Sequence, residues 1–417
     1  MGGTYGPIKP GLKRINRLLG LLGNPHTQFK TVQITGTNGK GSTASFLSSI
    51  LSDAGMATGL FTSPHILGPE ERISISGRVY DGNVSLELSS LRSIYRRKFK
   101  DYVKEMPTYF ELLTALAFRH FAEKRVDIAV VETGLGGRLD AVSAGKQYGM
   151  VMTGLGVDHT EYLGSSLEEI FLEKMGALSG QFLVTNRLPG FFHPMLQHYC
   201  DRKVNEISEL GHDFHVLKKY KGIFDFYSLE GCIHEIELRV DGEFQVENAA
   251  LAVESAVKVG GIRGLPFNHL KNAVKSGIPK VKIKGRFQTV SNNPRCILDV
   301  GHNVVAANAL VRELGELNLT QHQRTACVFT MRKNRDPYPF INILSRQVNQ
   351  FIYFYDGDET HNPQLLVTLG NLHGIPIFCR DSLKSAMEDA ERYCGREGVI
   401  LITGSFKAAE QQFRKVG

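Results

Sequence analysis

The 417-residue sequence has no apolar run that approaches the length of a membrane span. Its first residues, Met-Gly-Gly-Thr-Tyr-Gly, lack the basic and apolar regions of a secretory signal. Residue 6 is Gly, where N-myristoylation requires Ser or Thr. From these absences we expect a cytoplasmic protein that has no membrane as a partner.

The six cysteines are scattered and form no C-x-x-C pair. This spacing argues against a zinc site and a disulfide framework, and it fits a reducing cytosol. The net charge of +7 predicts anionic partners, but the basic residues are dispersed and no aromatic-basic recognition motif occurs. Nucleotide and carboxylate substrates explain the sign of the charge as well as nucleic acid does, and we expect no nucleic-acid partner.

The stretch from Thr31 to Gly55 predicts a strand, a glycine-rich loop and a helix, in that order. Val32 and Ile34, among β-branched threonines, are typical of a short buried strand. Glycines at positions 36, 39 and 41 end it, and from Ser42 onward apolar residues recur at a helical spacing. Such a stretch is the context of a phosphate-binding loop, because loop N–H groups and the helix N-terminus attract an anion.

Lys40 is expected to reach the outer phosphates of a nucleotide, and Ser42 or Thr43 to bind Mg²⁺. The spacing departs from the general pattern G-x-x-x-x-G-K-[ST], because the loop is shorter before the lysine and a glycine separates the lysine from the hydroxyls. The alternative is an ordinary glycine turn between a strand and a helix. Strand, lysine, hydroxyls and helix in one stretch favour a nucleotide site.

Polar side chains follow three further predicted strands, and ligands bind at the carboxyl ends of strands in an α/β sheet. One strand leads to Ser63, a second ends in Glu132, and a third leads to Asp158 and His159. An acidic residue at the end of a buried strand, opposite a phosphate loop, is where an Mg²⁺ ligand belongs. The alternatives are an ordinary turn at Ser63-Pro64, a cap or an Arg138 pair at Glu132, and a structural role for His159.

Lys174 occupies an unusual position in its predicted helix. Ser166-Leu-Glu-Glu169 is a capping box that opens this helix, and Lys174 shares one face with Leu167, Ile170, Phe171 and Leu178. A lysine on an apolar face is either a snorkelling side chain or one held near the site, where its charge would need a partner.

The second half of the chain predicts a further α/β domain. A helix over residues 242–259 carries Asn248, and Ser291-Asn-Asn-Pro294 is interpreted as a linker. Beyond it, predicted strands alternate with helices, and the first strand ends in Asp299-Val-Gly-His302. This alternation is typical of a Rossmann-like sheet. We therefore expect a P-loop domain over residues 1–290 and a smaller domain over 295–417, with further strands near 326–329, 351–354, 375–378 and 399–402.

A series of motifs runs along the chain: Gly36-Thr-Asn-Gly-Lys-Gly-Ser42, Thr62-Ser-Pro-His65 with Glu71-Arg-Ile73, Glu132-Thr-Gly-Leu-Gly-Gly-Arg-Leu-Asp-Ala141, Asp158-His159, Glu173-Lys174, Glu247-Asn-Ala249, Gly285-Arg-Phe-Gln288, Asp299-Val-Gly-His-Asn303 and Thr403-Gly-Ser-Phe406. In this order they strongly resemble the folylpolyglutamate synthase and dihydrofolate synthase family, within the Mur ligase superfamily. The resemblance covers nearly the whole length of the chain.

The resemblance implies an α/β fold with a P-loop-containing, Mur-ligase-like central domain and a smaller Rossmann-like C-terminal domain. It implies an ATP-dependent amide ligase. A folate carboxylate attacks the γ-phosphate of ATP to give an acyl phosphate, and the amino group of L-glutamate displaces phosphate from it. Dihydropteroate is a second acceptor if dihydrofolate synthase activity is also present. ATP and Mg²⁺ are the implied cofactors, a monovalent cation is left open, and we expect a monomer.

The family pattern also assigns roles to residues. Lys40, Lys174 and His302 are the implied catalytic residues. Lys174 matches the lysine that is carbamylated in such ligases, and His302 would lie near the incoming amino acid or the transferred phosphoryl group. The implied Mg²⁺ ligands are Ser42, Ser63, Glu132 and His159. The implied nucleotide contacts are Thr37, Asn38, Gly39, Lys40, Gly41, Ser42, Thr43, Asn248, Arg286 and Asp299.

Two stretches depart from the family pattern, Val304-Val305 after the Asp299 motif and Leu67-Gly-Pro-Glu70 before Glu71. Two other functions stay open. A Mur-type ligase for another carboxylate acceptor is disfavoured because the P-loop begins near residue 36, without an extra N-terminal nucleotide-sugar domain before it. A nucleotide-dependent switch protein is disfavoured because no Asn-Lys-x-Asp motif occurs and because a second domain follows.

Overall fold

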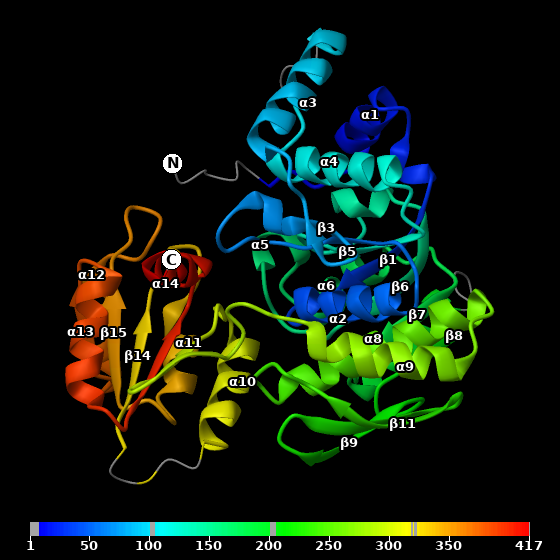
Figure 1. Cartoon of the computed structure of the whole chain (residues 1–417). Helices are drawn as coiled ribbons and strands as arrows, with labels where there is room; N and C mark the ends of the chain where they lie inside the picture. Colours follow the sequence, from blue (N-terminus) through cyan, green and yellow to red (C-terminus); the bar gives the residue numbers. More distant parts are fainter. Residues whose placement is uncertain (1–7, 101–104, 201–205, 318–319, 321–322, 417) are drawn as a thin grey trace. The chain divides into compact units, whose positions relative to one another are not determined.

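The computed structural model describes residues 8–100, 105–200, 206–317, 320 and 323–416, and Figure 1 follows the chain through them. The chain divides into two compact units. Unit 1 is Met1–Arg239 with Gln245–Val281, and unit 2 is Val240–Phe244 with Lys282–Gly417. The domain limits expected from the sequence, 1–290 and 295–417, remain a prediction.

Unit 1 is built on an eight-stranded sheet in the order β4-β3-β2-β5-β1-β6-β7-β8. From β2 to β8 neighbouring strands run parallel, and β3 and β4 add an antiparallel edge. The central strands β1 and β5 are almost wholly buried, as parallel strands covered on both faces are. In chain order the strands are β1 (Lys30–Thr35), β2 (Thr58–Phe61), β3 (Ile73–Ile75), β4 (Arg78–Val79), β5 (Ile128–Glu132), β6 (Gln147–Met152), β7 (Phe182–Thr185) and β8 (Glu206–Glu209).

Helices cover both faces of this sheet. Ala129 and Val131 of β5 share a hydrophobic core with α1 (Lys13–Leu21), α3 (Val84–Lys98) and α4 (Tyr109–Glu123). Because side chains alternate along a strand, Glu132 points to the opposite face. That face carries α2 (Lys40–Asp53), which packs against α9 (Phe267–Gly277).

The remaining helices of unit 1 lie nearer to the β7 edge or follow the small sheet. Residues of α6 (Leu167–Met175) and α7 (His193–Cys200) pack with β6 and β7 in one core cluster. A single turn, α5 (Thr160–Leu163), precedes α6, and α8 (Phe244–Ile262) leads into α9. The capping box predicted at Ser166 is formed and opens α6, and a capping box at Thr108 opens α4.

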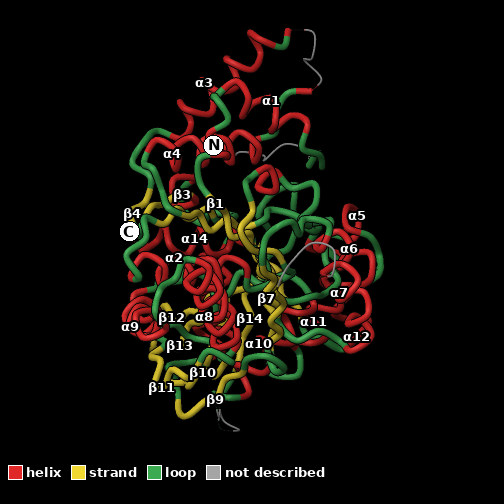
Figure 2. The backbone as a smooth tube through the Cα atoms, turned by 90° about the vertical axis from the view of Figure 1, so that its right-hand side faces the viewer, coloured by secondary structure: helices red, strands yellow, loops and turns green. Residues whose placement is uncertain are grey.

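A separate three-stranded antiparallel sheet also belongs to unit 1, and its strands carry labels at the lower edge of Figure 2. It consists of β9 (His215–Tyr220), β10 (Ile223–Ser228) and β11 (Gly231–Glu237). Phe224, Phe226, Ile233 and Ile236 are fully buried, whereas most of β9 is exposed. The sheet is therefore half-buried, with one polar side.

Unit 2 has a six-stranded sheet in the order β12-β13-β17-β14-β15-β16. From β13 to β16 neighbouring strands run parallel, and β12 is an antiparallel edge. The predicted Rossmann-like alternation is confirmed: the strands are β12 (Gln288–Asn292), β13 (Arg295–Leu298), β14 (Thr325–Phe329), β15 (Gln350–Phe354), β16 (Ile377–Arg380) and β17 (Val399–Thr403), and the helices are α10 (Val304–Gly315), α11 (Pro337–Leu344), α12 (Pro363–His373), α13 (Leu383–Cys394) and α14 (Phe406–Val416).

The linker predicted at Ser291–Pro294 is wrong, because β12 and β13 pair antiparallel and these residues form the end of a hairpin inside unit 2. Asn and Pro are common in hairpin turns and in linkers alike, so composition does not separate the two. The sequence also gave no sign of α7. Helix α3 ends at Lys98, and residues 101–104 lie outside the described part of the chain.

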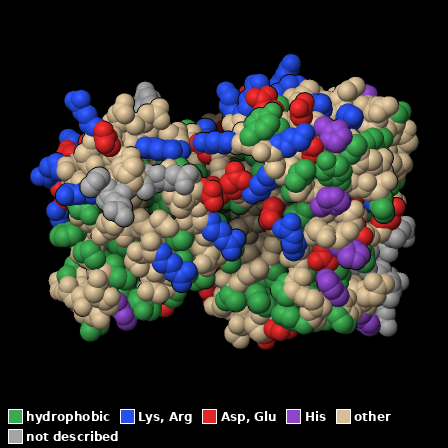
Figure 3. Space-filling model, turned by 90° about the horizontal axis from the view of Figure 1, so that it is seen from below, with side chains coloured by type: hydrophobic (Ala, Val, Ile, Leu, Met, Phe, Trp, Pro, Cys, Tyr) green, Lys and Arg blue, Asp and Glu red, His purple; other side chains and the backbone are tan. Residues whose placement is uncertain are grey.

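The surface carries charges of both signs. On the face drawn in Figure 3, Lys and Arg side chains lie among Asp and Glu side chains instead of gathering in one basic patch. Among the helices that the structure describes, none combines the length and the apolar character that a membrane span needs.

Candidate active site

The glycine-rich loop between β1 and α2 is pinned by side chains from two other elements. Gly36 has φ 138° and Gly39 has φ 84°, which are conformations that glycine adopts easily and other residues rarely do. A Cβ on Gly36 would lie 2.2 Å from Thr153 Oγ1, and a Cβ on Gly39 would lie 2.3 Å from Asn248 Oδ1. Only glycine therefore fits at either position, and the loop is closed between the end of β6 and α8.

Hydrogen bonds fix the backbone of this loop. The Thr37 N–H donates to Gly154 O at 3.0 Å, and Thr153 Oγ1 donates to Asn38 O at 2.6 Å. With the Asn38 carbonyl bonded to Thr153, the loop leads directly into α2, which begins at Lys40. This is the strand–loop–helix geometry that the sequence predicts for a phosphate-binding loop.

Two lysines converge on one carbonyl of the loop. Lys40 Nζ donates to Gly36 O at 3.0 Å and to Thr37 O at 2.9 Å, and Lys174 Nζ donates to Gly36 O at 3.0 Å. The Lys174 side chain is 2% exposed, so it does not snorkel to the surface. The structure thus brings two of the predicted catalytic residues to the same point of the loop.

The environment of Lys174 disfavours its charged form. Burial, and then the neighbouring Lys40, lower the pKa of its amine to about 7, while Asp158 and Glu173 act in the opposite direction. At pH 7 about half of the Lys174 amines are therefore neutral. A neutral lysine amine is a nucleophile, whereas an ammonium group is not.

Glu132 reaches the loop from β5. It is 3% exposed, its Oε2 accepts the Ser63 N–H at 2.7 Å, and the same oxygen lies 3.3 Å from where a Cβ on Gly41 would be. His159 has φ 52°, a strained conformation for a residue with a side chain, and its N–H donates to Asp158 Oδ1 at 2.7 Å. Glu132 and the Ser63 backbone thus lie together near the start of α2.

The residues fit a phosphate group and a divalent cation. The Thr43 hydroxyl is buried in the first turn of α2 and makes no hydrogen bond within the described part of the chain. In the described part of the chain, no group of three His, Cys, Asp or Glu side chains is placed so that it could hold a metal ion without other ligands. A site with one carboxylate, hydroxyls and phosphate oxygens is what Mg²⁺ prefers. Metal binding by Ser42, Ser63, Glu132 and His159 stays a prediction.

Gln245 is a site residue that the sequence did not reveal. The Asn248 amide donates to Gln245 Oε1 at 2.9 Å, and both side chains are buried. Among the described residues, the Nε2 of Gln245 has no hydrogen-bond partner. The spacing of three residues places both amides on one face of α8, which is the signal that could have identified the pair.

Asp140 lies in the motif that begins at Glu132, but the sequence analysis gave it no role in the site. Its carboxylate accepts the Leu135 N–H at 2.9 Å and the Val142 N–H at 3.0 Å, which shapes the loop after β5. Burial raises the pKa of Asp140 to about 7, against the opposing effect of these N–H groups and of Lys40.

A histidine–arginine pair fixes the loop after β2. Arg72 Nε donates to His65 Nδ1 at 3.0 Å, so this nitrogen of His65 acts as an acceptor. Burial, and then the Arg72 guanidinium, lower the pKa of His65 to about 4. His65 is therefore neutral at physiological pH.

Unit 2 gathers its three predicted residues at the carboxyl end of β13. Asp299 Oδ2 accepts the Phe287 N–H at 2.8 Å, and its Oδ1 accepts the Gly301 N–H at 2.6 Å. Burial raises the pKa of Asp299 and the charge of Arg286 opposes that rise. Arg286 Cζ lies 5.5 Å from the centre of the Phe406 ring.

His302 belongs to the same cluster of unit 2. Its Nδ1 lies 3.0 Å from Val300 O, and its ring centre lies 6.4 Å from that of Phe406. Phe406 opens α14, so this aromatic ring joins β13 to the last helix. The roles of Arg286, Asp299 and His302 toward nucleotide or amino acid stay predictions.

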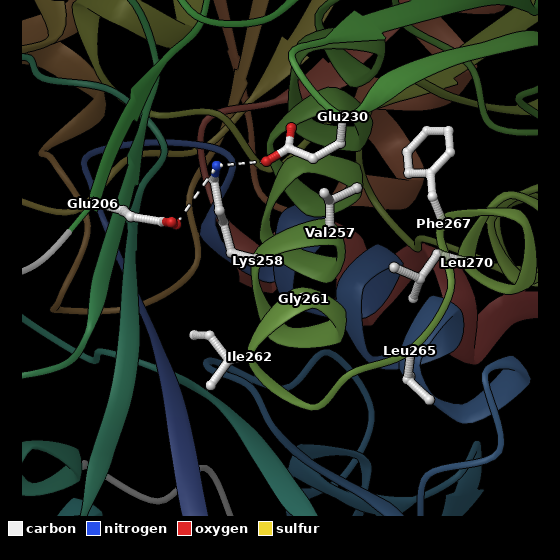
Figure 4. A pocket seen from close by; sticks show the side chains of 9 residues that line it. All are labelled: Glu206, Glu230, Val257, Lys258, Gly261, Ile262, Leu265, Phe267 and Leu270. Carbon is white, nitrogen blue, oxygen red and sulfur yellow. Dashed lines mark hydrogen bonds and ion pairs between the residues drawn. The ribbon is translucent and has the colours of Figure 1, made fainter.

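A cavity of about 300 Å³ lies elsewhere in unit 1, and no residue of the glycine loop lines it (Figure 4). Lys258 Nζ lies 3.1 Å from Glu230, 3.3 Å from Glu254 and 3.6 Å from Glu206. The other walls are apolar, from α8, α9 and the connection between them. Three carboxylates thus surround one lysine, which is a structural ion-pair cluster rather than a phosphate site.

Comparisons with known proteins agree with this geometry. The family model for the Mur ligase middle domain matches residues 34–256, and that for the Mur ligase, glutamate ligase domain matches residues 285–406. The chain is 32% identical over 412 residues to the dihydrofolate synthase/folylpolyglutamate synthase of Bacillus subtilis, covering 95% of this chain and 93% of the relative. The chain belongs to the dihydrofolate synthase/folylpolyglutamate synthase family of Mur ligases.

Other members of this family are also similar to the chain. The dihydrofolate synthetase of Saccharomyces cerevisiae is 31% identical over 393 residues, covering 88% of this chain and 83% of the relative. The solved structure of Mycobacterium tuberculosis folylpolyglutamate synthase complexed with ADP has a TM-score of 0.88 at 27% identity, covering 99% of this chain and 96% of that chain. The predicted resemblance, fold class and membership of an ATP-dependent ligase family are confirmed.

Proposed function

We propose that this protein is an ATP-dependent ligase that joins L-glutamate to a folate, and that it also accepts dihydropteroate. The observation that carries the proposal is the convergence of Lys40 and Lys174 on Gly36 O, next to Glu132, in a chain related to folylpolyglutamate and dihydrofolate synthases. Both acceptors are proposed because the relatives include bifunctional enzymes and a dihydrofolate synthetase.

The loop residues bind and orient the triphosphate. The N–H groups at the start of α2, the helix dipole and Lys40 neutralise phosphate charge, which is most of what phosphoryl transfer requires of a protein. Ser42, Ser63, Glu132 and His159 would hold Mg²⁺, which when bound offsets the charge that develops on the phosphate oxygens.

The ligation itself needs no protein nucleophile. The acceptor carboxylate takes the γ-phosphoryl group and becomes an acyl phosphate, and the glutamate amine then displaces phosphate. Arg286, Asp299 and His302 of unit 2 are proposed to contact nucleotide and the incoming amino acid. His302 Nδ1 lies 3.0 Å from Val300 O, which orients the imidazole ring at the carboxyl end of β13.

Lys174 is proposed to act as a carbamate. The pKa of about 7 leaves much of its amine neutral, which is the form that adds CO₂. The carbamate would place a negative charge beside Lys40, where the Lys174 ammonium would place a positive one. We also propose a monomeric, cytoplasmic protein, and we leave a monovalent cation open as a further cofactor; the free cysteines in the described part of the chain support a reducing compartment.

The test is Mg²⁺-dependent phosphate release from ATP in the presence of L-glutamate. Tetrahydrofolate, dihydropteroate or no acceptor is supplied in parallel reactions, and formation of the glutamyl product is followed by mass spectrometry. We expect release with either acceptor and none without. Lys40→Ala should abolish release, whereas Lys124→Ala, at an exposed position of unit 1, should not. Release that needs neither acceptor would support a nucleotide switch, and ATP binding without release would favour a different carboxylate acceptor.

A further inference from the structure

Three side chains on the polar side of the β9–β11 sheet form a chain of close contacts that the ligase site does not use. Cys232 Sγ lies 3.3 Å from His234 Nε2, and His234 Nδ1 lies 2.9 Å from Asp225 Oδ2. Cys232 and His234 come from β11 and Asp225 from β10. The sheet is labelled in the lower parts of Figures 1 and 2.

The local backbone holds Asp225 in place. The register of β10 and β11 shifts between Phe224 and Phe226, and Glu235 on β11 has φ 54°. This strained residue donates its N–H to Asp225 Oδ1 at 2.7 Å. The bulge sets two residues of β11, His234 and Glu235, opposite Asp225 of β10, so that the His234 ring and the Glu235 N–H both meet the Asp225 carboxylate.

The Asp225 carboxylate stays ionised. Burial alone would raise the pKa of Asp225, but the Glu235 N–H, His234 and Lys219 together hold it well below its ordinary value. Lys219 Nζ lies 3.2 Å from Asp225 Oδ2. An ionised carboxylate only accepts hydrogen bonds, so His234 donates from Nδ1 and keeps the lone pair of Nε2 for Cys232.

This is the arrangement that activates a thiol. A cysteine within hydrogen-bond reach of an imidazole, which a carboxylate orients in turn, is the general pattern of an activated nucleophile. The side chain of His234 is 49% exposed and Cys232 is half-buried, so a solute can reach the sulfur. Cys232 is also the only cysteine of unit 1 whose side chain the structure describes.

We propose that Cys232 is a reactive thiol, activated by His234 and Asp225, that exchanges with low-molecular-weight disulfides. The Cys232 S–H proton passes to His234 Nε2, and the thiolate attacks one sulfur of the disulfide. The S–S bond of the small molecule breaks as the new S–S bond to Cys232 forms. The released thiolate takes the proton from His234 and leaves as a thiol, so Cys232 is oxidised and the leaving half of the disulfide is reduced.

Charges of both signs surround the Cys232–His234–Asp225 cluster. The charged or titratable groups that face it are Lys219 and His215 from β9, Asp225 and Tyr227 from β10, and Glu235 from β11. Glutathione disulfide is the probe, because its exchange with a thiol leaves a mixed disulfide that mass spectrometry detects.

The experiment treats the whole chain with glutathione disulfide and measures each cysteine by peptide mass spectrometry. Cys379 of unit 2 is the internal reference, because it is also half-buried and burial raises its pKa. We expect Cys232 to react at least about tenfold faster than Cys379 at pH 7. Equal rates would overturn the proposal.

Variants separate activation from mere exposure. His234→Gln should slow the reaction of Cys232 about tenfold at pH 7, because the base that takes up the S–H proton is removed. Asp225→Asn should slow the same reaction, because the carboxylate that orients the imidazole is removed. His212→Gln is the matched control. The His212 side chain is 81% exposed and its ring contacts the neighbouring Asp213, so this change should leave the reaction of Cys232 unaltered. A His234→Gln protein that folds, binds ATP and keeps the wild-type rate of Cys232 reaction would refute the proposal.

Discussion

Replacing Lys174 by Met is expected to stabilise unit 1 while it removes ligase activity. Methionine has a similar length and no charge, and the face of α6 that carries Lys174 is otherwise apolar. The folded pKa of Lys174 is about 7, against 10.5 for the ordinary lysine. Between these two pKa values the Lys174 amine is protonated in the unfolded chain but largely neutral in the folded protein.

The size and the sign of the effect follow from this difference. Between pH 7 and pH 10.5 the unfolded chain binds more protons at Lys174 than the folded chain does, so the stability of the wild type rises with pH there. At pH 7 the buried lysine lowers the free energy of unfolding of the wild type by about 4 kcal/mol, because the unfolded chain favours the charged form. The variant loses the hydrogen bond to Gly36 O, which offsets about 1 kcal/mol of this difference. Lys174→Met should thus be about 3 kcal/mol more stable at pH 7, and the advantage should shrink by about 2 kcal/mol at pH 9.

Urea unfolding of both proteins at pH 7, 8 and 9, in buffers freed of CO₂, measures this advantage. Lys124→Ala, at an exposed position of unit 1, is the control and should leave the stability unchanged at each pH. Direct titration of the Lys174 Nζ by ¹⁵N NMR checks the pKa itself. An advantage that does not change with pH, or a Lys174→Met protein less stable than the wild type at pH 7, would refute the reasoning.

Three further changes test separate parts of the fold. Gly39→Ala should weaken ATP binding at least about tenfold in calorimetry, because its Cβ would lie 2.3 Å from Asn248 Oδ1 and φ 84° strains any other residue. Lys258→Met should lower the free energy of unfolding by about 3 kcal/mol in urea, since it leaves the buried carboxylate of Glu254 without its ion pair. His65→Gln should abolish a loss of stability that the wild type shows as pH falls from 6.5 toward 4, because the folded pKa of His65 is depressed to about 4 and the unfolded chain takes up the proton first. Thermal unfolding at pH 4.5 and pH 7 measures that difference.

Local patterns in the sequence predicted the parts of the fold that local physics determines. The glycine loop with its strand and helix, the capping box at Ser166, and the buried strand that ends in Glu132 all form at the predicted residues. In each case neighbours in sequence supply the cause: alternation for the strand, a side-chain cap for the helix, and positive φ for the glycines.

The parts that the sequence did not reveal depend on contacts between distant residues. Thr153 reaches Gly36 because β6 pairs with β1. Gln245 takes part in the site because it bonds Asn248, the residue of α8 that lies against Gly39. A threonine at a strand end and a glutamine in a helix carry no local signature of such roles. The hairpin at Ser291–Pro294 was missed for the same reason, since strand pairing rather than composition separates a turn from a linker.

Three residues that break local rules lie in segments around the glycine loop of unit 1. Lys174 puts a charge into an apolar helix face, His159 adopts φ 52°, and Asp140 keeps a carboxyl group fully buried with its pKa raised to about 7. Each of these costs stability that an apolar or flexible substitute would avoid, and each lies in a segment that follows or faces the glycine loop. A fold that needed only stability at this edge would favour methionine, glycine and asparagine at these positions. Destabilising residues that cluster around Gly36 are therefore what is expected of a functional site, where chemistry and not stability determines the residues.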